Sequence, residues 1–229
     1  KGLSFVVVGM NDEKSPLFPD EVRRLISEHR IFSGGRRHRE LVGELLPEGA
    51  VWIDIVVPLS DVYAQYRHYD EPILVFASGD PLFFGFTTTL MREFEGRVTK
   101  TFPSFSSLQM LAHALRLPYH DMRVVSLTGR PWHEFDRALI ERAHKVGVLT
   151  DRKNTPATIA KRMLDYGYTA YRMHVGVLLG GEREETYSLP LEEVVTKDFA
   201  HPNCLIIEAV EPQPYDAPLG LKELDFFPL

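Results

Sequence analysis

The stretch with the strongest chemical signal is an apolar run, residues 73–77, that leads directly into Ser78, Gly79, Asp80 and Pro81. A buried strand followed by a polar turn is typical of open α/β sheets, in which ligands bind at the carboxyl ends of the strands. A glycine in such a turn lets a ligand approach the backbone closely. A purely local alternative makes Asp80 the N-cap and Pro81 the first residue of the next helix. The two interpretations are compatible, because a capped turn often forms a ligand loop.

Two later segments have the same pattern of strand, polar turn and helix. The first contains Ser104, Ser106 and Ser107, and either Ser104 or Ser106 is a candidate N-cap for the helix that follows. The second is residues 150–157, in which Thr155 precedes a proline and is a candidate N-cap. None of the three loops is a Walker loop or a dinucleotide fingerprint, so they do not indicate an NTPase or a dehydrogenase.

A cluster of cations opens an expected helix at residues 36–46. Arg36, Arg37, His38 and Arg39 all fall in or next to its first turn. Cations there oppose the helix dipole, at a cost of about 0.3–1 kcal/mol each. A solvated polar face is one interpretation. The other is that the cluster binds an anion, such as a polycarboxylate or a phosphate, together with the helix N-terminus.

Composition excludes several other classes of protein. The chain has 229 residues and a formal charge of −6, which argues against a nucleic-acid partner. Its apolar runs are far shorter than the roughly 20 residues of a membrane helix. Cys204, the only cysteine, fits a buried core position in a reducing, cytoplasmic setting and leaves no cysteine-based metal site, so we expect no metal. The sequence has no Gly-x-Ser-x-Gly motif, so a hydrolase nucleophile elbow is not indicated either.

Short apolar runs alternate with helical patterns along the chain, which predicts an α/β fold with a largely parallel sheet. The expected strands are residues 3–8, 51–57, 73–77, 97–102, 123–127, 146–150, 171–179 and 205–210. The expected helices are residues 19–29, 36–46, 84–94, 106–115, 133–143 and 156–166.

The chain is expected to form two lobes of about 100 residues each. Pro118 disfavours helical geometry at the preceding residue, so we place the boundary there, with an N-terminal lobe at residues 1–117 and a C-terminal lobe at 118–211. Residues 212–229 are rich in proline and are expected to form a linker or docking tail rather than part of a core.

The order of the motifs resembles that of the tetrapyrrole methylase family of S-adenosylmethionine (SAM) dependent enzymes. Within the family, the resemblance is to the type that methylates carbon 5 of precorrin-6Y (CbiE, the N-terminal part of CobL). The segments that carry it are residues 33–38, 77–85, 103–109, 125–131, 149–157 and 179–181. Together they lie within residues 3–211, which is nearly the whole chain.

The resemblance implies a two-lobed tetrapyrrole methylase fold (a class III SAM-dependent methyltransferase), in which each lobe is an α/β sandwich with a mixed sheet. It also implies the residues that bind the cofactor: Ser78, Gly79, Asp80, Phe83, Ser106, Ser107, Leu127, Thr128, Ala157, Pro202 and Asn203. Arg36, Arg37, His38 and Arg130 are expected to bind the carboxylates of the macrocycle. No catalytic residue is assigned, because the macrocycle supplies its own nucleophilic carbon and the protein mainly positions and desolvates the reactants.

Two segments depart from the family pattern. The first strand is followed by Met10, Asn11, Asp12 and Glu13 instead of a glycine-rich turn, and Ser104 replaces the usual glycine after proline. The first departure bears on the loop expected to face the tetrapyrrole, and the second on the backbone geometry at Ser104.

The implied reaction is methylation of carbon 5 of precorrin-6Y or precorrin-6B, or of the cobalt-precorrin equivalent, in cobalamin biosynthesis, with S-adenosylhomocysteine (SAH) as the second product. The implied partners are a CbiT-type methyltransferase/decarboxylase domain, fused or separate, and a second copy of the chain in a homodimer. Two alternatives remain open: another activity of the family, on a different precorrin or uroporphyrinogen, and a non-catalytic tetrapyrrole-binding module.

Overall fold

The computed structural model describes residues 2–13 and 15–210, and the linker expected at residues 212–229 lies outside them. The chain divides into two compact units. Of the described residues, unit 1 holds those up to Met110 together with Leu178–Glu184, and unit 2 holds Leu111–Val177 and residues 185–210. The division falls inside helix α5 (Ser107–Leu115), and the lobe boundary expected at Pro118 stays a prediction.

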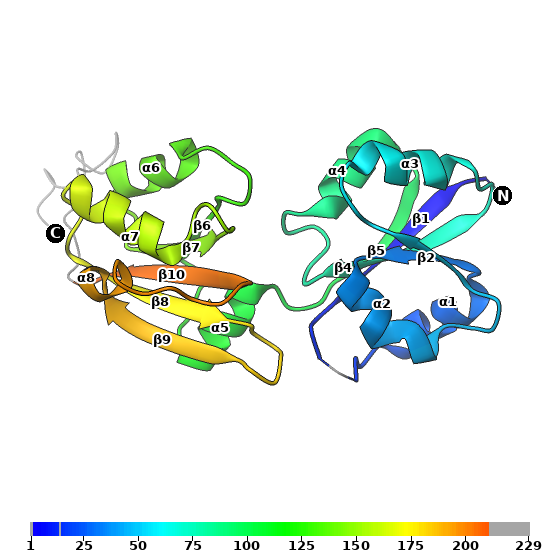
Figure 1. Ribbon diagram of the computed structural model, residues 1–229, viewed down its shortest axis with the longest axis horizontal. Helices are drawn as coiled ribbons and strands as arrows, with labels where there is room; N and C mark the ends of the chain where they lie inside the picture. Colours follow the sequence, from blue (N-terminus) through cyan, green and yellow to red (C-terminus); the bar gives the residue numbers. More distant parts are fainter. Residues whose placement is uncertain (1, 14, 211–229) are drawn as a thin grey trace, which may run out of the picture. The chain divides into compact units, whose positions relative to one another are not determined.

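Unit 1, which carries the end marked N in Figure 1, is built on a five-stranded sheet. The strand order is β3-β2-β4-β1-β5. Every pairing in it is parallel. The strands are β1 (Ser4–Met10), β2 (Ile31–Gly34), β3 (Val51–Asp54), β4 (Pro72–Ser78) and β5 (Val98–Phe102). Because the strands are parallel, the loops after β1, β2, β4 and β5 all leave the same edge of the sheet.

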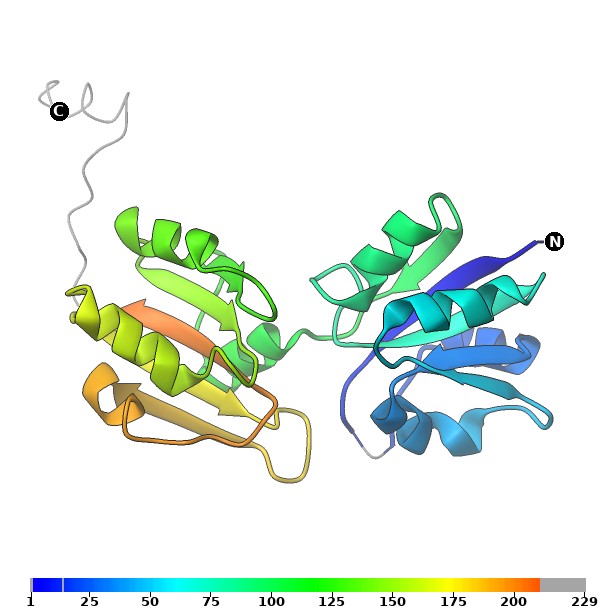
Figure 2. The ribbon, with the colours of Figure 1, turned by 45° about the horizontal axis from the view of Figure 1, so that its top comes forward.

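Helices cover both faces of this sheet (Figure 2). Phe5 and Val7 of β1 pack in a core that includes residues of α3 and α4, whereas Val6 and Val8 pack on the opposite face in a core that includes residues of α1 and α2. This explains the uninterrupted apolar run of β1, which is typical of a strand buried on both faces. The helices are α1 (Asp20–Glu28), α2 (Arg36–Val42), the 3₁₀ turn η1 (Gly43–Leu45), α3 (Leu59–Arg67) and α4 (Phe86–Glu93).

Unit 2 contains a mixed five-stranded sheet in the order β6-β7-β10-β8-β9. β6 and β7 are parallel, while β10 runs antiparallel to both β7 and β8, and β9 is antiparallel to β8. The elements are β6 (Arg123–Ser126), α6 (His133–Ile140), β7 (Lys145–Leu149), α7 (Pro156–Asp165), β8 (Tyr171–Val177), β9 (Glu185–Pro190), α8 (Leu191–Val194) and β10 (Asn203–Ala209).

The two-lobed α/β fold class expected from the sequence is confirmed, with two corrections of detail. The sheet of unit 1 is wholly parallel, and not mixed as the resemblance implied. The sheet of unit 2 is mixed, as the resemblance implied, and not largely parallel as the strand–helix alternation predicted, because the last strand, β10, inserts between β7 and β8 in the opposite direction. The strand–helix pattern of the sequence does not predict β2, β9, α3 or α8. None of the described helices is long and apolar enough to cross a membrane.

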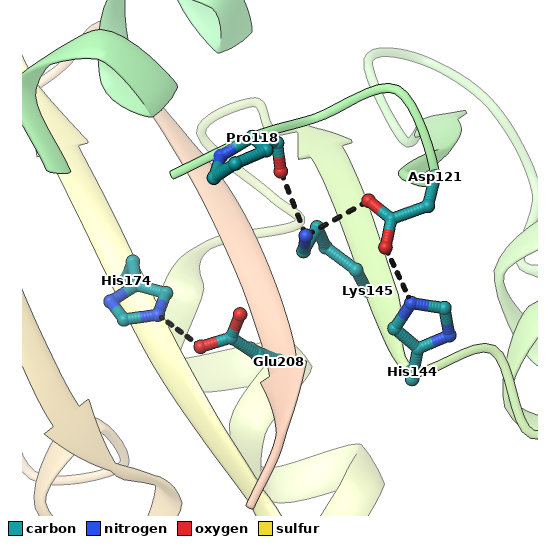
Figure 3. Close-up of polar contacts among 6 residues, drawn as sticks. All are labelled: Pro118, Asp121, His144, Lys145, His174 and Glu208. Carbon is teal, nitrogen blue, oxygen red and sulfur yellow. Dashed lines mark hydrogen bonds and ion pairs between the residues drawn. The ribbon is translucent and has the colours of Figure 1, made fainter. Parts of the chain in front are cut away.

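A buried cation fixes the segment that follows α5 in unit 2 (Figure 3). Lys145, at the start of β7, is 6% exposed, and its Nζ donates to the carbonyl oxygen of Pro118 at 2.8 Å and to Asp121 Oδ1 at 2.9 Å. Asp121 Oδ2 lies 2.7 Å from His144 Nε2. The contacts with His144 and Lys145 both lower the pKa of Asp121, and the contact with His144 has the larger effect. The buried charge is therefore paired, as buried charges in stable proteins usually are.

Candidate functional site

The turn after β4 holds the first group of expected cofactor residues. Gly79 has a φ of 66°, which favours glycine, and its N–H donates to the Met10 carbonyl at 2.8 Å. Asp80 Oδ1 accepts from the N–H of Leu82 at 2.9 Å, so the carboxylate closes a turn onto its own backbone. Helix α4 begins only at Phe86. The alternative that makes Asp80 the N-cap and Pro81 the first helical residue is therefore wrong.

Close backbone packing explains the glycines in this region. A Cβ on Gly79 would lie 3.3 Å from the Phe105 carbonyl oxygen and from Ser106 Cα, so the turn after β4 touches the loop after β5. A Cβ on Gly9 would lie 2.2 Å from the Gly79 carbonyl oxygen. The glycines thus bring the ends of β1 and β4 and the loop after β5 together.

Ser106 resolves the choice of N-cap for α5. Its Oγ accepts from the N–H of Gln109 at 3.2 Å, and its own N–H donates to Gln109 Oε1 at 2.9 Å, which forms a capping box. The Oγ of Ser104 instead donates to Oδ1 of Asn11, in the loop after β1, at 3.2 Å. The two segments that depart from the family pattern are therefore in direct contact.

His38 connects the arginine cluster to the turn after β4. Its Nδ1 accepts from the backbone N–H of Gly35 at 3.1 Å, and its Nε2 lies 2.9 Å from Ser78 Oγ. Burial lowers the pKa of His38, while the nearby carboxylate of Asp12 acts in the opposite direction. An Nδ1 that accepts a hydrogen bond is unprotonated, so the neutral ring carries its proton on Nε2 and donates to Ser78.

The two expected arginines of α2 differ in their surroundings. The side chain of Arg36 is 94% exposed and lies 3.5 Å from Glu40. Arg37 donates from Nε to Asp12 Oδ1 at 2.5 Å and lies 3.3 Å from Glu40, and both contacts raise its pKa. Arg37, but not Arg36, borders a cavity of about 670 Å³ in unit 1. It is lined by Asp12, Glu13, Arg37, Leu178, Gly180, Gly181, Glu182 and Arg183.

The second group of expected cofactor residues meets in unit 2. Thr128 follows β6, and its Oγ1 donates to the Thr150 carbonyl at 2.9 Å. The hydroxyl of Thr150 in turn lies 2.6 Å from both the carbonyl oxygen and Oδ1 of Asn203, which begins β10. Pro202 precedes Asn203, and Ala157 lies in the first turn of α7. Three loops of unit 2 therefore converge through hydroxyl and amide contacts.

Two residues that the sequence analysis did not assign organise this second group. Asp151 accepts hydrogen bonds from the backbone N–H groups of Asn154, Gly129 and Lys153. These bonds lower the pKa of Asp151, and the bond from Asn154 has the largest effect. Asn154 is 7% exposed, and its Nδ2 donates to the Leu127 carbonyl at 2.8 Å. An Asp three residues before an Asn in a turn is the only local signal for them. Thr155 caps α7 as expected, accepting from the N–H of Thr158.

Comparison with known proteins decides the family. Residues 6–195 match the family described as Tetrapyrrole (Corrin/Porphyrin) Methylases. The chain belongs to the tetrapyrrole methylase family. This confirms the resemblance seen in the sequence motifs.

Two curated relatives bear on what this methylase does. A precorrin-6Y C(5,15)-methyltransferase [decarboxylating] of Sinorhizobium sp is 32% identical over 180 residues, which cover 78% of this chain and 43% of the relative. A cobalt-precorrin-7 C(5)-methyltransferase of Salmonella typhimurium is 31% identical over 192 residues, which cover 82% of this chain and 91% of the relative. The methylase thus spans less than half of the first relative and most of the second.

A solved structure shows the same fold. The uroporphyrin-III C-methyl transferase from Thermus thermophilus, complexed with S-adenyl homocysteine, superposes with a TM-score of 0.67 at 21% identity. The match covers 90% of this methylase and 92% of that chain.

Proposed function

We propose that this methylase transfers a methyl group from SAM to carbon 5 of a precorrin macrocycle in cobalamin biosynthesis, with or without cobalt in the ring. The observation that carries the proposal is the match to the cobalt-precorrin-7 C(5)-methyltransferase over 91% of that relative's length. The bifunctional C(5,15) relative is matched over 43% of its length, so methylation at carbon 15 and decarboxylation are not assigned to this chain.

The residues of the two groups suit SAM chemically. In unit 1, exposed Ser78 and half-buried Asp80 supply polar groups, and half-buried Phe83, whose N–H donates to the Asp80 carbonyl oxygen at 3.0 Å, supplies an apolar side chain. The capped loop at Ser106 and Ser107 touches the same turn. In unit 2, Leu127, Thr128, Ala157, Pro202 and Asn203 are likewise proposed to bind SAM. The Thermus relative with the same fold was solved with the demethylated product.

When bound, SAM supplies an electrophilic methyl group, which the macrocycle carbon takes as the carbon–sulfur bond breaks and SAH leaves. The protein residues position the reactants and exclude water, which are the main catalytic contributions available to them. No side chain is needed as a nucleophile, and none of the residues assigned to the cofactor is given that role.

Arg36, Arg37 and Arg130 are the proposed partners of the substrate's acetate and propionate groups. Guanidinium groups form strong, charge-assisted hydrogen bonds with carboxylates. Arg36 is almost fully exposed, and Arg37 sits beside the cavity, although Asp12 and Glu40 compete for it. His38, which the sequence analysis grouped with them, has both ring nitrogens bonded within the protein.

Two macromolecular partners belong to the same proposal. A methyltransferase/decarboxylase domain of the CbiT type, fused or separate, would complete the second methylation, as the name of the C(5,15) relative indicates for that protein. A homodimer is the proposed assembly, by analogy with the family. Light scattering at several protein concentrations measures the assembly, and a mass equal to one chain at all of them contradicts it.

The decisive experiment is an assay of methyl transfer. The protein is incubated with SAM carrying a ¹³C-labelled methyl group and the reduced precorrin, in metal-free and cobalt forms, and the labelled carbon is located by NMR. We expect one methyl group at carbon 5 and no release of carbon dioxide. Methylation at another carbon favours a different activity of the family, whereas SAH binding without transfer to either form favours a binding module.

A further inference from the structure

His38 bridges two elements that carry different parts of the proposed site. It lies in the first turn of α2, beside Arg36 and Arg37, and its Nε2 lies 2.9 Å from Ser78 Oγ at the end of β4. The other ring nitrogen is held by the Gly35 N–H at 3.1 Å. Because the Gly35 N–H cannot change its role as donor, the direction of the second bond is fixed: His38 donates and Ser78 accepts.

This arrangement determines what Ser78 can offer to a ligand. A serine hydroxyl has one hydrogen to donate and normally rotates to suit its surroundings. In this protein its oxygen already accepts from His38, and within the described residues no acceptor is found for its hydrogen. The hydroxyl is therefore oriented, with a free donor at an exposed position in the turn after β4.

We propose that His38 is a positioning residue, whose neutral ring holds the Ser78 hydroxyl so that its hydrogen is presented to an oxygen of the methyl donor. This inference rests on the proposed function, since it takes the turn after β4 as the place where that donor binds. It gives His38 a role on the cofactor side and leaves recognition of the macrocycle's carboxylates to the arginines.

The surroundings of His38 favour the neutral ring. A protonated ring would turn Nδ1 into a second donor that faces the Gly35 N–H, and that bond would be lost. Burial lowers the pKa of His38, and the one nearby charge that raises it is Asp12, in the loop after β1. Asp12 is itself bonded to Arg37, while Glu40 of α2 is bonded to Arg36 and Arg37. The ring therefore stays neutral to a lower pH than an ordinary histidine does.

Two substitutions separate the roles of the two ring nitrogens. His38→Asn places an amide at the level of Nδ1, so it can still accept from Gly35 but does not reach Ser78. His38→Gln places an N–H at the level of Nε2, so it can still donate to Ser78 and does not titrate. Arg39→Ala, an exposed change in the same helix, is the matched control.

Calorimetric titration with SAH gives the first readout. We expect His38→Asn to weaken SAH binding by about fivefold, the typical effect of one neutral hydrogen bond. His38→Gln and Arg39→Ala should stay close to the wild type. Ser78→Ala should weaken binding by a similar factor, and the His38→Asn/Ser78→Ala double variant should lose no more than either single variant, because both remove the same interaction.

The pH profile and the macrocycle affinity give the second and third readouts. Wild-type affinity for SAH should fall as the pH drops through the pKa of His38, which lies below the ordinary histidine value, and His38→Gln should lack this fall. Unchanged SAH affinity in His38→Asn overturns the proposal. If this variant binds SAH normally but binds the macrocycle more weakly, His38 is a ligand of the macrocycle's carboxylates instead. Failure of the wild type to bind SAH at all is a different result, since it overturns the proposed function before any variant is compared.

Discussion

Arginines in the first turn of α2 lead to the most direct prediction at the scale of single residues. Arg36→Ala combined with Arg37→Ala should raise the dissociation constant of the macrocycle about tenfold or more, because two charge-assisted hydrogen bonds are lost. Both side chains face water and already lie near carboxylates, so the loss of affinity per hydrogen bond is smaller than it would be at a buried site. Fluorescence or absorbance titration with the macrocycle measures it.

Arg23→Ala, an exposed change in α1, is the control, and the affinity for SAH should be unchanged in the double variant. An unchanged macrocycle affinity in Arg36→Ala/Arg37→Ala contradicts the assignment. Recovery of affinity in Arg36→Lys/Arg37→Lys would show that charge suffices, whereas no recovery would indicate that the planar fork of the guanidinium is required.

At the scale of elements, the meeting point of β1, β4 and the β5 loop tolerates no side chain at Gly9. A Cβ there would lie 2.2 Å from the Gly79 carbonyl oxygen and 2.9 Å from that of Phe102. Because these are backbone atoms, the strands would have to separate, and Gly9→Ala should destabilise the protein by about 3 kcal/mol or more. Urea denaturation measures the change in the free energy of unfolding.

Gly43 provides the matched control for that substitution. It follows α2 with helical dihedral angles, and nothing lies within 4 Å of a Cβ placed there. Gly43→Ala should therefore leave stability unchanged or raise it by up to about 1 kcal/mol. Equal stability of the Gly9 and Gly43 variants would contradict the close packing of the three segments.

The segment joining α5 to β6 is expected to give a dependence of stability on pH. Contacts with His144 and Lys145 lower the pKa of Asp121 in the folded protein (Figure 3). A lowered pKa means that the folded state binds this proton less readily than the unfolded chain does. The stabilisation is therefore complete above the ordinary aspartate pKa of about 3.9 and is lost as the pH falls through the lower, folded value.

Asp121→Asn tests this dependence. Its melting temperature should lie below that of the wild type at pH 6, and the difference should narrow as the pH falls below about 4. Asp198→Asn, at an exposed aspartate for which no ion pair is found in the described residues, is the control. A difference between Asp121→Asn and the wild type that stays constant from pH 6 to pH 2 contradicts the role of this carboxylate.

At the scale of the whole molecule, the proposed cofactor should stabilise the fold through binding. A ligand at 100 times its dissociation constant adds about 2.7 kcal/mol to the free energy of unfolding. For a chain of this size, that corresponds to a rise in melting temperature of roughly 5–10 °C. Differential scanning calorimetry with increasing SAH measures it, with ATP as the control ligand. A melting temperature that does not respond to millimolar SAH argues against the cofactor assignment.

The sequence by itself determined the fold class, the family and the chemical types of the proposed site residues. These rest on local patterns: apolar runs buried on both faces, Thr155 before a proline as a cap, and the polar turn after β4. Local patterns also failed to predict some short elements, because few residues give a weak periodic pattern. β2 has four residues, and its buried Ser33 is polar yet satisfied by the Ile53 carbonyl and the hydroxyl of Tyr66. The residues next to Ser33 in the sequence do not predict these two hydrogen-bond partners.

Only the tertiary structure decided which of these residues meet. His38 and Ser78 are forty positions apart in sequence, and Thr150 and Asn203 fifty-three apart. Their contacts depend on strand order and register, which arise from the packing of helices and strands and not from the pattern within any one element. The direction of β10 was fixed in the same way, because an apolar strand has the same side-chain pattern whether it runs parallel or antiparallel to its neighbours.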